Sequence, residues 1–163
     1  MKQKITTLLT LAVLAFTGCG KSDAPASAPA TPAPADGVRT VEITANDAMK
    51  YSLTEIRTRP GEKLRVALTN LGHMPKQAMG HNWVLLTPRD DAAVLTFAAS
   101  AAGKMPAYLP DDLTGVLAHT KVLGGGETDA VEFTAPAAPG EYPFLCTFPG
   151  HAALMRGKLI VAP

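Results

Sequence analysis

The sequence predicts an all-β fold, an antiparallel sandwich or barrel with one helix, for residues 38–163. Short segments that alternate apolar and polar residues recur along this part of the chain, and Pro and Gly separate them. Hydrophobic residues make up 47% of the 163 residues and charged residues only 18%, so a buried core is feasible. One longer segment breaks the two-residue alternation and has the features of a helix.

Four segments carry the clearest strand pattern. In "VRTVEIT" Val41 and Ile43 alternate with polar residues, and "KLRVALT" repeats the pattern with Leu64, Val66 and Leu68. "DAVEFTA" and the short apolar run "GKLIVA" near the end of the chain follow the same logic. Strands of this length and spacing are typical of a two-layer β domain.

The helix is expected in "TPRDDAAVLTFAASAAG", residues 87–103. Thr87 is the predicted N-cap, with Pro88 in the first turn and Asp90 three residues after the cap. Gly103 provides a stop signal. The expectation is one short helical insertion between strands.

The first 18 residues form a predicted signal peptide. "MKQK" is a basic start, "ITTLLTLAVLAF" is an apolar run, and small residues precede Cys19. "FTGC" resembles a bacterial lipobox, although Phe16 stands where Leu is usual. We expect Cys19 to be lipid-modified; the alternative is an ordinary signal peptide with an incidental cysteine.

Residues 19–37 are the predicted lipid-bearing cysteine followed by an Ala/Pro-rich linker. The run "GKSDAPASAPATPAPADG" contains no aromatic or large apolar side chain and cannot build a core. It would hold the domain away from a membrane surface. The remaining domain has twelve basic and twelve acidic residues, which gives no indication of a nucleic-acid surface.

The candidate site lies near the end of the chain, in "CTFPGHAALM". Tyr142, Phe144 and Cys146 alternate, so they share one strand face, and that face is expected to be inward. "FPGH" fits a type II turn that returns His151 towards Cys146. Met155 follows four residues later, so the loop can bring two sulfur donors and one nitrogen donor together.

A further donor comes from "MGHNWVLL", where His81, Trp83 and Leu85 alternate on one face. Taken alone, His81 is more often a hydrogen-bonded core histidine than a ligand. Together with Cys-x4-His-x3-Met it completes two imidazoles, one thiolate and one thioether, the donor set of a blue-copper site. A zinc site and a Cys-His nucleophile fit less well, because Met is a poor zinc ligand and Cys146 ends an apolar strand.

The domain resembles the azurins, bacterial members of the cupredoxin family. "NDAMKY", "AMGHNWVL", "LAHTKVLGGGE" and "FLCTFPGHAALMRGKL" carry the resemblance, which covers essentially all of residues 38–163. It implies an eight-stranded Greek-key cupredoxin sandwich with one type 1 copper, Cu(I)/Cu(II). His81, Cys146 and His151 would be the strong ligands. Met155 and the carbonyl of Gly80 would be weak axial contacts.

The resemblance also implies roles around the copper ligands. Asn82 would tie the two ligand segments together, and the backbone amides of Asn82 and Phe148 would donate to the Cys146 sulfur. An apolar patch for docking redox partners would gather around His151; ordinary loop packing is the alternative for its members. The patch comprises Met49, Met79, Phe148 and Pro149, with Met74 and Ala153.

Two positions depart from the azurin pattern. A disulfide common near the N-terminal strand is absent, because Arg39 and the segment Gly61–Glu62 occupy its positions. A histidine often found before the Pro-rich loop aligns with Asn70, so proton uptake linked to that histidine is not expected here. His119 matches a family histidine that is not a ligand.

The functional expectation is a non-enzymatic electron carrier. By resemblance its partners would be c-type cytochromes or copper or haem reductases. Its location would be the periplasmic side of a bacterial membrane, through a lipid anchor and with the outer membrane favoured. The alternative is a copper-binding module for storage, delivery or resistance with the same ligands.

Overall fold

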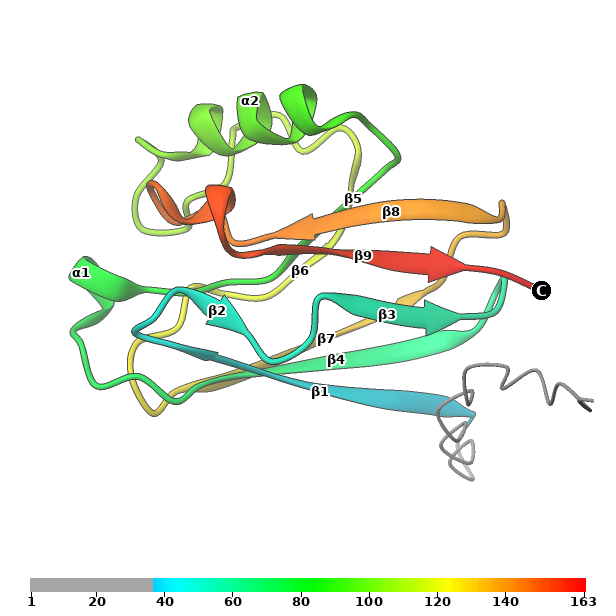
Figure 1. Cartoon of the computed structure of the whole chain (residues 1–163), viewed down its shortest axis with the longest axis horizontal. Helices are drawn as coiled ribbons and strands as arrows, with labels where there is room; N and C mark the ends of the chain where they lie inside the picture. Colours follow the sequence, from blue (N-terminus) through cyan, green and yellow to red (C-terminus); the bar gives the residue numbers. More distant parts are fainter. Residues whose placement is uncertain (1–36) are drawn as a thin grey trace, which may run out of the picture. The chain divides into compact units, whose positions relative to one another are not determined.

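Two β-sheets packed face to face make up the domain (Figure 1). This computed structural model describes residues 37–163. The predicted signal peptide, Cys19 and the linker up to residue 36 lie outside the described residues. Within residues 37–163, no helix is long and apolar enough to cross a membrane.

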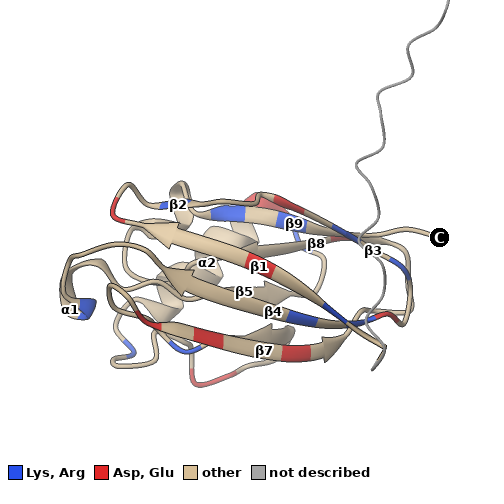
Figure 2. Ribbon diagram, turned by 90° about the horizontal axis from the view of Figure 1, so that it is seen from below, with Lys and Arg blue, Asp and Glu red and all other residues tan. Residues whose placement is uncertain are grey.

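The first sheet has the strand order β2-β1-β4-β7. Its strands are β1 (Val38–Asn46), β2 (Lys50–Tyr51), β4 (Lys63–Asn70) and β7 (Thr128–Thr134). Charged residues of both signs lie along β1, β4 and β7 on the outer surface of this sheet (Figure 2). A cross-strand ion pair between Arg65 and Glu132, 3.8 Å apart, is one example.

The second sheet has the order β3-β9-β8-β5-β6. Its strands are β3 (Glu55–Thr58), β5 (Val84–Leu86), β6 (Val116–His119), β8 (Gly140–Leu145) and β9 (Arg156–Val161). The chain crosses between the sheets at most of its connections. Only the β1–β2, β5–β6 and β8–β9 connections join neighbours within one sheet.

The sandwich architecture is confirmed, but the expectation of a purely antiparallel sheet is wrong. β1 pairs with β4 in parallel, and β3 pairs with β9 in parallel. Nine strands are present among the described residues rather than eight. The difference arises after Asn46, because β2 pairs with β1 in one sheet while β3, only a few residues on, pairs with β9 in the other. If β2 and β3 are counted as one strand that changes sheets, the number of strands is the predicted eight.

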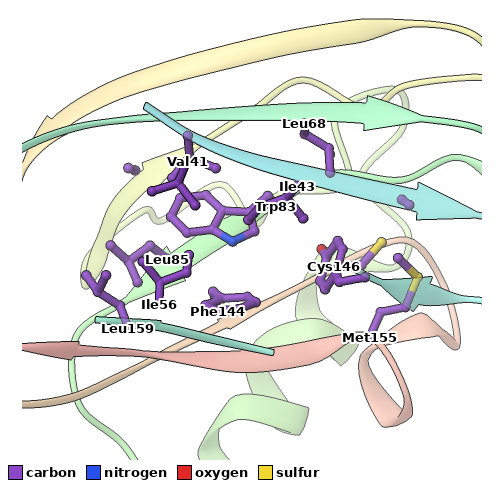
Figure 3. Packing of buried hydrophobic residues seen from close by; sticks show 14 of the residues in the cluster. Val41, Ile43, Ile56, Leu68, Trp83, Leu85, Phe144, Cys146, Met155 and Leu159 are labelled. Atoms are coloured by element: carbon purple, nitrogen blue, oxygen red, sulfur yellow. The ribbon is translucent and has the colours of Figure 1, made fainter. Parts of the chain in front are cut away.

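The main core lies between the two sheets. Trp83 is at its centre, fully buried and packed between the rings of Phe144 at 5.5 Å and Phe133 at 5.9 Å. Figure 3 shows that the inward residues of both sheets surround it. The alternating apolar positions predicted from the sequence, Ile43, Leu64, Val66 and Leu68 among them, are buried there.

The long helix, α2 (Asp91–Ala101), covers the outer face of the second sheet (Figure 1). Val94 and Phe97 pack against a smaller buried cluster that includes Leu145. Strand β8 is therefore buried on both faces, since Phe144 points into the main core and Leu145 points towards α2.

The predicted N-cap of this helix is wrong. Asp90, not Thr87, caps it, because the Asp90 carboxylate accepts a hydrogen bond of 2.8 Å from the Ala93 N–H. Thr87 is engaged elsewhere: its N–H donates to the Gly115 carbonyl and its hydroxyl accepts from Arg89. Two single-turn helices, α1 (Lys76–Met79) and the 3-10 helix η1 (His151–Ala153), were not predicted.

Candidate metal centre

Three buried donors from distant parts of the sequence converge at one end of the sandwich. The nearest ligand atoms of His81, Cys146 and His151 all lie within 4.8 Å of one another. All three residues are buried, with at most 3% of their surface exposed. The structure therefore brings together the three residues that the sequence predicted as strong ligands.

Hydrogen bonds within the loop after β8 fold its backbone back on itself. The Cys146 N–H donates to the Met155 carbonyl at 2.9 Å, and the Met155 N–H donates to the His151 carbonyl at 2.8 Å. The predicted type II turn is present: Gly150 has a φ of 81° and the His151 N–H donates to the Phe148 carbonyl at 3.0 Å. This closed loop places the His151 ring 3.6 Å from the Cys146 sulfur, measured to Nδ1.

His81 lies in the segment that precedes β5, outside the loop that carries Cys146 and His151. Its backbone pairs with Leu123 through two hydrogen bonds of 3.0 and 2.7 Å. Neither of its buried ring nitrogens makes a hydrogen bond of good geometry among residues 37–163. The Asn46 backbone and the Asp47 carboxylate nevertheless lie near enough to oppose the lowering of the His81 pKa. A neutral imidazole has one N–H and one lone pair, and a metal between the three residues would take the lone pair.

Burial controls the protonation of all three donors. It lowers the pKa of His81, and burial together with the nearby His81 lowers the pKa of His151 to about 4. Both imidazoles are thus neutral and able to bind a metal at neutral pH. Burial raises the pKa of the free Cys146 thiol to about 11, although hydrogen bonds from the backbone amides of Asn82 and Phe148 oppose this. A metal cation would stabilise the thiolate directly.

Asn82 joins the two ligand segments. Its side-chain amide donates to the Thr147 hydroxyl at 2.8 Å, and its side-chain oxygen accepts from the Thr147 N–H at 2.9 Å. Thr147 in turn donates to the Tyr108 carbonyl at 2.5 Å. This clamp fixes the spacing between the residue after His81 and the residue after Cys146.

Sequence reasoning missed three residues that support the site. Thr147 completes the clamp on Asn82, and Leu123 holds the His81 backbone. Tyr51, in β2, donates its hydroxyl proton to the Asn82 carbonyl. All three lie inside the quoted family-like segments or beside a ligand, but side-chain hydrogen bonds between distant segments leave no periodic signal.

The two predicted weak ligands lie at the same end. Met155 is fully buried, and Figure 3 shows its sulfur and that of Cys146 at the end of the core beyond Trp83. Gly80 is held too tightly for any side chain. A Cβ built there would lie 2.6 Å from the Val122 side chain and 2.7 Å from the Lys76 carbonyl oxygen.

The predicted docking residues do not form a uniformly exposed patch. Pro149 and Ala153 are exposed and Met74 is 41% exposed, whereas Met49 and Met79 are partly buried. Phe148 is 7% exposed, and its ring packs 4.7 Å from that of His151. Phe148 therefore offers little surface of its own and covers one side of the His151 imidazole, and its place in a docking patch stays a prediction.

The chemistry of the donor groups fits copper, and their burial argues against a Cys-His nucleophile. Two neutral imidazoles and one thiol suit both oxidation states of copper, and the nearby thioether adds a soft fourth donor. Cys146 has no exposed surface, so its sulfur cannot reach a substrate carbonyl as an exposed nucleophile would.

Comparisons with known proteins agree with this donor set. The family model described as copper binding proteins, plastocyanin/azurin family, matches residues 38–162. An azurin of Achromobacter denitrificans is 45% identical over 120 residues, which are 72% of this chain and 80% of that protein. An azurin of Pseudomonas aeruginosa is 43% identical over 122 residues, 73% of this chain and 82% of that protein.

Solved structures show the same likeness in fold. Auracyanin A from Chloroflexus aurantiacus, described as a blue copper protein, matches with a TM-score of 0.70 and 33% identity. The match covers 77% of this chain and all of that one. An azurin from Methylomonas sp. strain J matches with a TM-score of 0.67 and 32% identity, over 77% of this chain and 98% of that one. The cupredoxin sandwich expected from the sequence is confirmed.

Proposed function

The chain belongs to the plastocyanin/azurin family of copper-binding proteins, and we propose that it is a type 1 copper protein carrying single electrons between redox partners. The observation that carries this proposal is the convergence of the buried ligand groups of His81, Cys146 and His151 within 4.8 Å of one another. The His81 ring nitrogens make no hydrogen bond of good geometry in the described domain, and metal ligation would use one of them.

We assign the ligands from this grouping and from the likeness to azurins. His81, Cys146 and His151 would be the strong ligands, and the Met155 thioether and the Gly80 carbonyl would be weaker contacts. Copper bound there would supply a one-electron couple between Cu(I) and Cu(II). The residues around it hold the donors in place, since their backbones are tied by Leu123, by Thr147 through Asn82, and by the closed loop after β8.

This bonding favours electron transfer over storage or delivery. A carrier benefits when its ligands move little between oxidation states, and the ligand segments here are cross-linked by hydrogen bonds that do not involve the metal. A delivery protein instead has to release copper to its target. The closed loop between Cys146 and Met155 would have to open for such a release.

We place electron exchange at the His151 edge. His151 is 3% exposed while His81 is fully buried, and its neighbours Pro149 and Ala153 lie at the surface. The equal numbers of acidic and basic residues after residue 37 favour brief encounters with weak salt dependence. The partners would be redox proteins such as c-type cytochromes or copper or haem reductases.

We also propose that the domain is tethered by lipid on Cys19 on the periplasmic side of a bacterial membrane, with the outer membrane favoured. The support is the sequence "FTGC" after a short apolar run, followed by the Pro-rich linker. Mass spectrometry of the mature N-terminus tests this directly. A chain that begins with diacylated Cys19 is expected, and an unmodified N-terminus would contradict the anchor.

Optical and electrochemical measurements on the copper-loaded protein test the electron-carrier role. An intense visible thiolate-to-Cu(II) charge-transfer band and a reversible one-electron couple are expected. A colourless copper adduct without a reversible couple would contradict the proposal and favour the storage or delivery role.

A further inference from the structure

Tyr51 lies at the edge of the candidate metal centre and is not one of its ligands. It belongs to β2, is 7% exposed, and packs edge-on against Phe144 with the ring centroids 5.9 Å apart. Its hydroxyl donates to the carbonyl oxygen of Asn82, the residue that follows His81.

The hydrogen bond from Tyr51 affects the site through Asn82, whose other polar groups bind the two ligand segments. Its side chain is occupied on both atoms by Thr147, and its backbone N–H donates to the Cys146 sulfur. The Tyr51 hydroxyl occupies its remaining polar group, the carbonyl oxygen. Every polar group of Asn82 is therefore used, and two of those bonds fix the peptide units on either side of the residue.

We propose that Tyr51 is a positioning residue of the metal centre, because its hydroxyl donates to the Asn82 carbonyl and holds the backbone whose N–H faces the Cys146 sulfur. The inference rests on the copper function proposed above. Tyr51 acts on the sulfur through Asn82 and does not donate to it.

The effect on the centre comes through the Asn82 N–H, which faces the Cys146 sulfur. A hydrogen-bond donor beside a thiolate stabilises the electron-rich, reduced state of a copper–thiolate unit. It also withdraws electron density from the sulfur and so raises the energy of charge transfer to Cu(II). Holding Asn82 in place keeps this donor aimed at the sulfur.

These effects have defined signs. Tyr51→Phe keeps the ring and its contact with Phe144 but releases the Asn82 carbonyl. The Asn82 N–H should then donate less well to the sulfur, so the reduction potential should fall. The visible charge-transfer band should move to longer wavelength. A residue that only filled space would change neither, because its ring remains.

Tyr142 provides a matched control. It is also buried, at 5% exposure, and its hydroxyl also donates to a backbone carbonyl, that of Ala138, at 2.8 Å. Ala138 lies in the connection before β8, at the opposite end of that strand from Cys146. Tyr142→Phe therefore removes a comparable hydrogen bond and costs comparable stability without touching the site.

The test compares full-length, copper-loaded wild type, Tyr51→Phe and Tyr142→Phe by absorption and voltammetry. A lower potential and a longer-wavelength band in Tyr51→Phe alone are expected. Unchanged values in Tyr51→Phe, or equal changes in both variants, would overturn the inference. A wild type that lacks the blue band would instead contradict the copper proposal, so the two failures are distinct.

A second variant keeps the inference testable if Tyr51→Phe does not fold. Site-specific replacement of Tyr51 by 3-fluorotyrosine retains the hydroxyl and makes it a stronger donor. The potential should rise and the band should move to shorter wavelength, opposite to the Phe variant. An unchanged potential would overturn the role of the hydroxyl.

Discussion

The two ends of the sandwich treat their polar groups in opposite ways. The β3–β4 turn lies at the end away from α1 (Figure 1), and there the partly buried Arg39 and Glu62 form a salt bridge of 2.5 Å. Arg39 also donates to the Arg57 carbonyl, and Glu62 accepts from Thr58 and from the Arg59 N–H. At the other end, neither buried ring nitrogen of His81 makes a hydrogen bond of good geometry within residues 37–163.

The difference separates residues kept for stability from residues kept for binding. A charge pair with its hydrogen bonds satisfied holds β1 to the β3–β4 turn, at the positions where azurins commonly carry a disulfide. A buried ring nitrogen without a good hydrogen bond costs free energy in the metal-free protein. At His81 a bound metal would recover part of that cost.

The largest expected effect is on the metal end. Cys146→Ser should abolish the visible charge-transfer band and most of the copper affinity, because an alcohol is a far weaker ligand than a thiolate. Absorption spectroscopy with copper titration measures both. Circular dichroism of the metal-free variant checks that the fold survives, and a band that persists would disprove the assignment of Cys146.

Breaking the Arg39–Glu62 ion pair at the opposite end should change the stability of the domain but not its metal site. Arg39→Met leaves Glu62 without its cation and should lower the free energy of unfolding by about 1–3 kcal/mol. Urea unfolding of the metal-free protein measures the change. The copper spectrum should not move, and a spectral shift would show that the two ends are coupled.

Removing the unsatisfied histidine should have the opposite sign. His81→Leu replaces a buried imidazole that makes no hydrogen bond of good geometry in the described domain by an apolar side chain. The loss of its weak interactions with Asn46 and Asp47 offsets part of the benefit, so the metal-free protein should gain about 1 kcal/mol. Urea unfolding in the presence of a chelator measures this gain. A clear loss of stability would mean that the imidazole is already satisfied in solution, which would weaken the comparison.

The smallest expected effect is a pH dependence at the Arg39 end. Partial burial acts to raise the pKa of Glu62, but hydrogen bonds from Arg39, the Arg59 N–H and Thr58 outweigh it and lower the pKa to about 2. Because the folded-state pKa lies below the unfolded-state pKa, this stabilisation is complete above about pH 4.5 and is lost as pH falls towards 2.

The Arg39→Met variant isolates this effect. Its stability difference from wild type should be largest above about pH 4.5 and should shrink as the pH is lowered. Unfolding curves of both metal-free proteins at matched pH values provide the measurement. A difference that stays constant down to pH 2 would exclude Glu62 as the titrating group.

Much of the fold was predictable because alternation reports burial directly. Ile43, Leu64 and Phe144 were expected inward and are buried. Alternation does not report which strand pairs with which, so the parallel β1–β4 and β3–β9 pairs were missed. The cap was misassigned because Thr87 and Asp90 have equivalent capping chemistry, and only the pairing of Thr87 with Gly115 distinguishes them.

Three of the donors, Cys146, His151 and Met155, were predictable because their spacing in one loop is local. His81 lies in a distant segment and was assigned only together with that loop. The Pro149-Gly150 turn needs a positive φ that Gly supplies, and this returns His151 to Cys146.

The support from Tyr51 and Thr147 was not predictable, because it depends on contacts across 31 and 65 residues of sequence. The packing of Phe148 against Tyr108 was not predictable for the same reason.

X-ray absorption at the copper edge of the loaded wild-type protein tests the central claim most directly. If His81, Cys146 and His151 hold the metal, the spectrum should show one short copper–sulfur path and two imidazole nitrogen paths per copper. A copper surrounded only by nitrogen and oxygen would contradict the account, whatever the affinity of the protein for the ion.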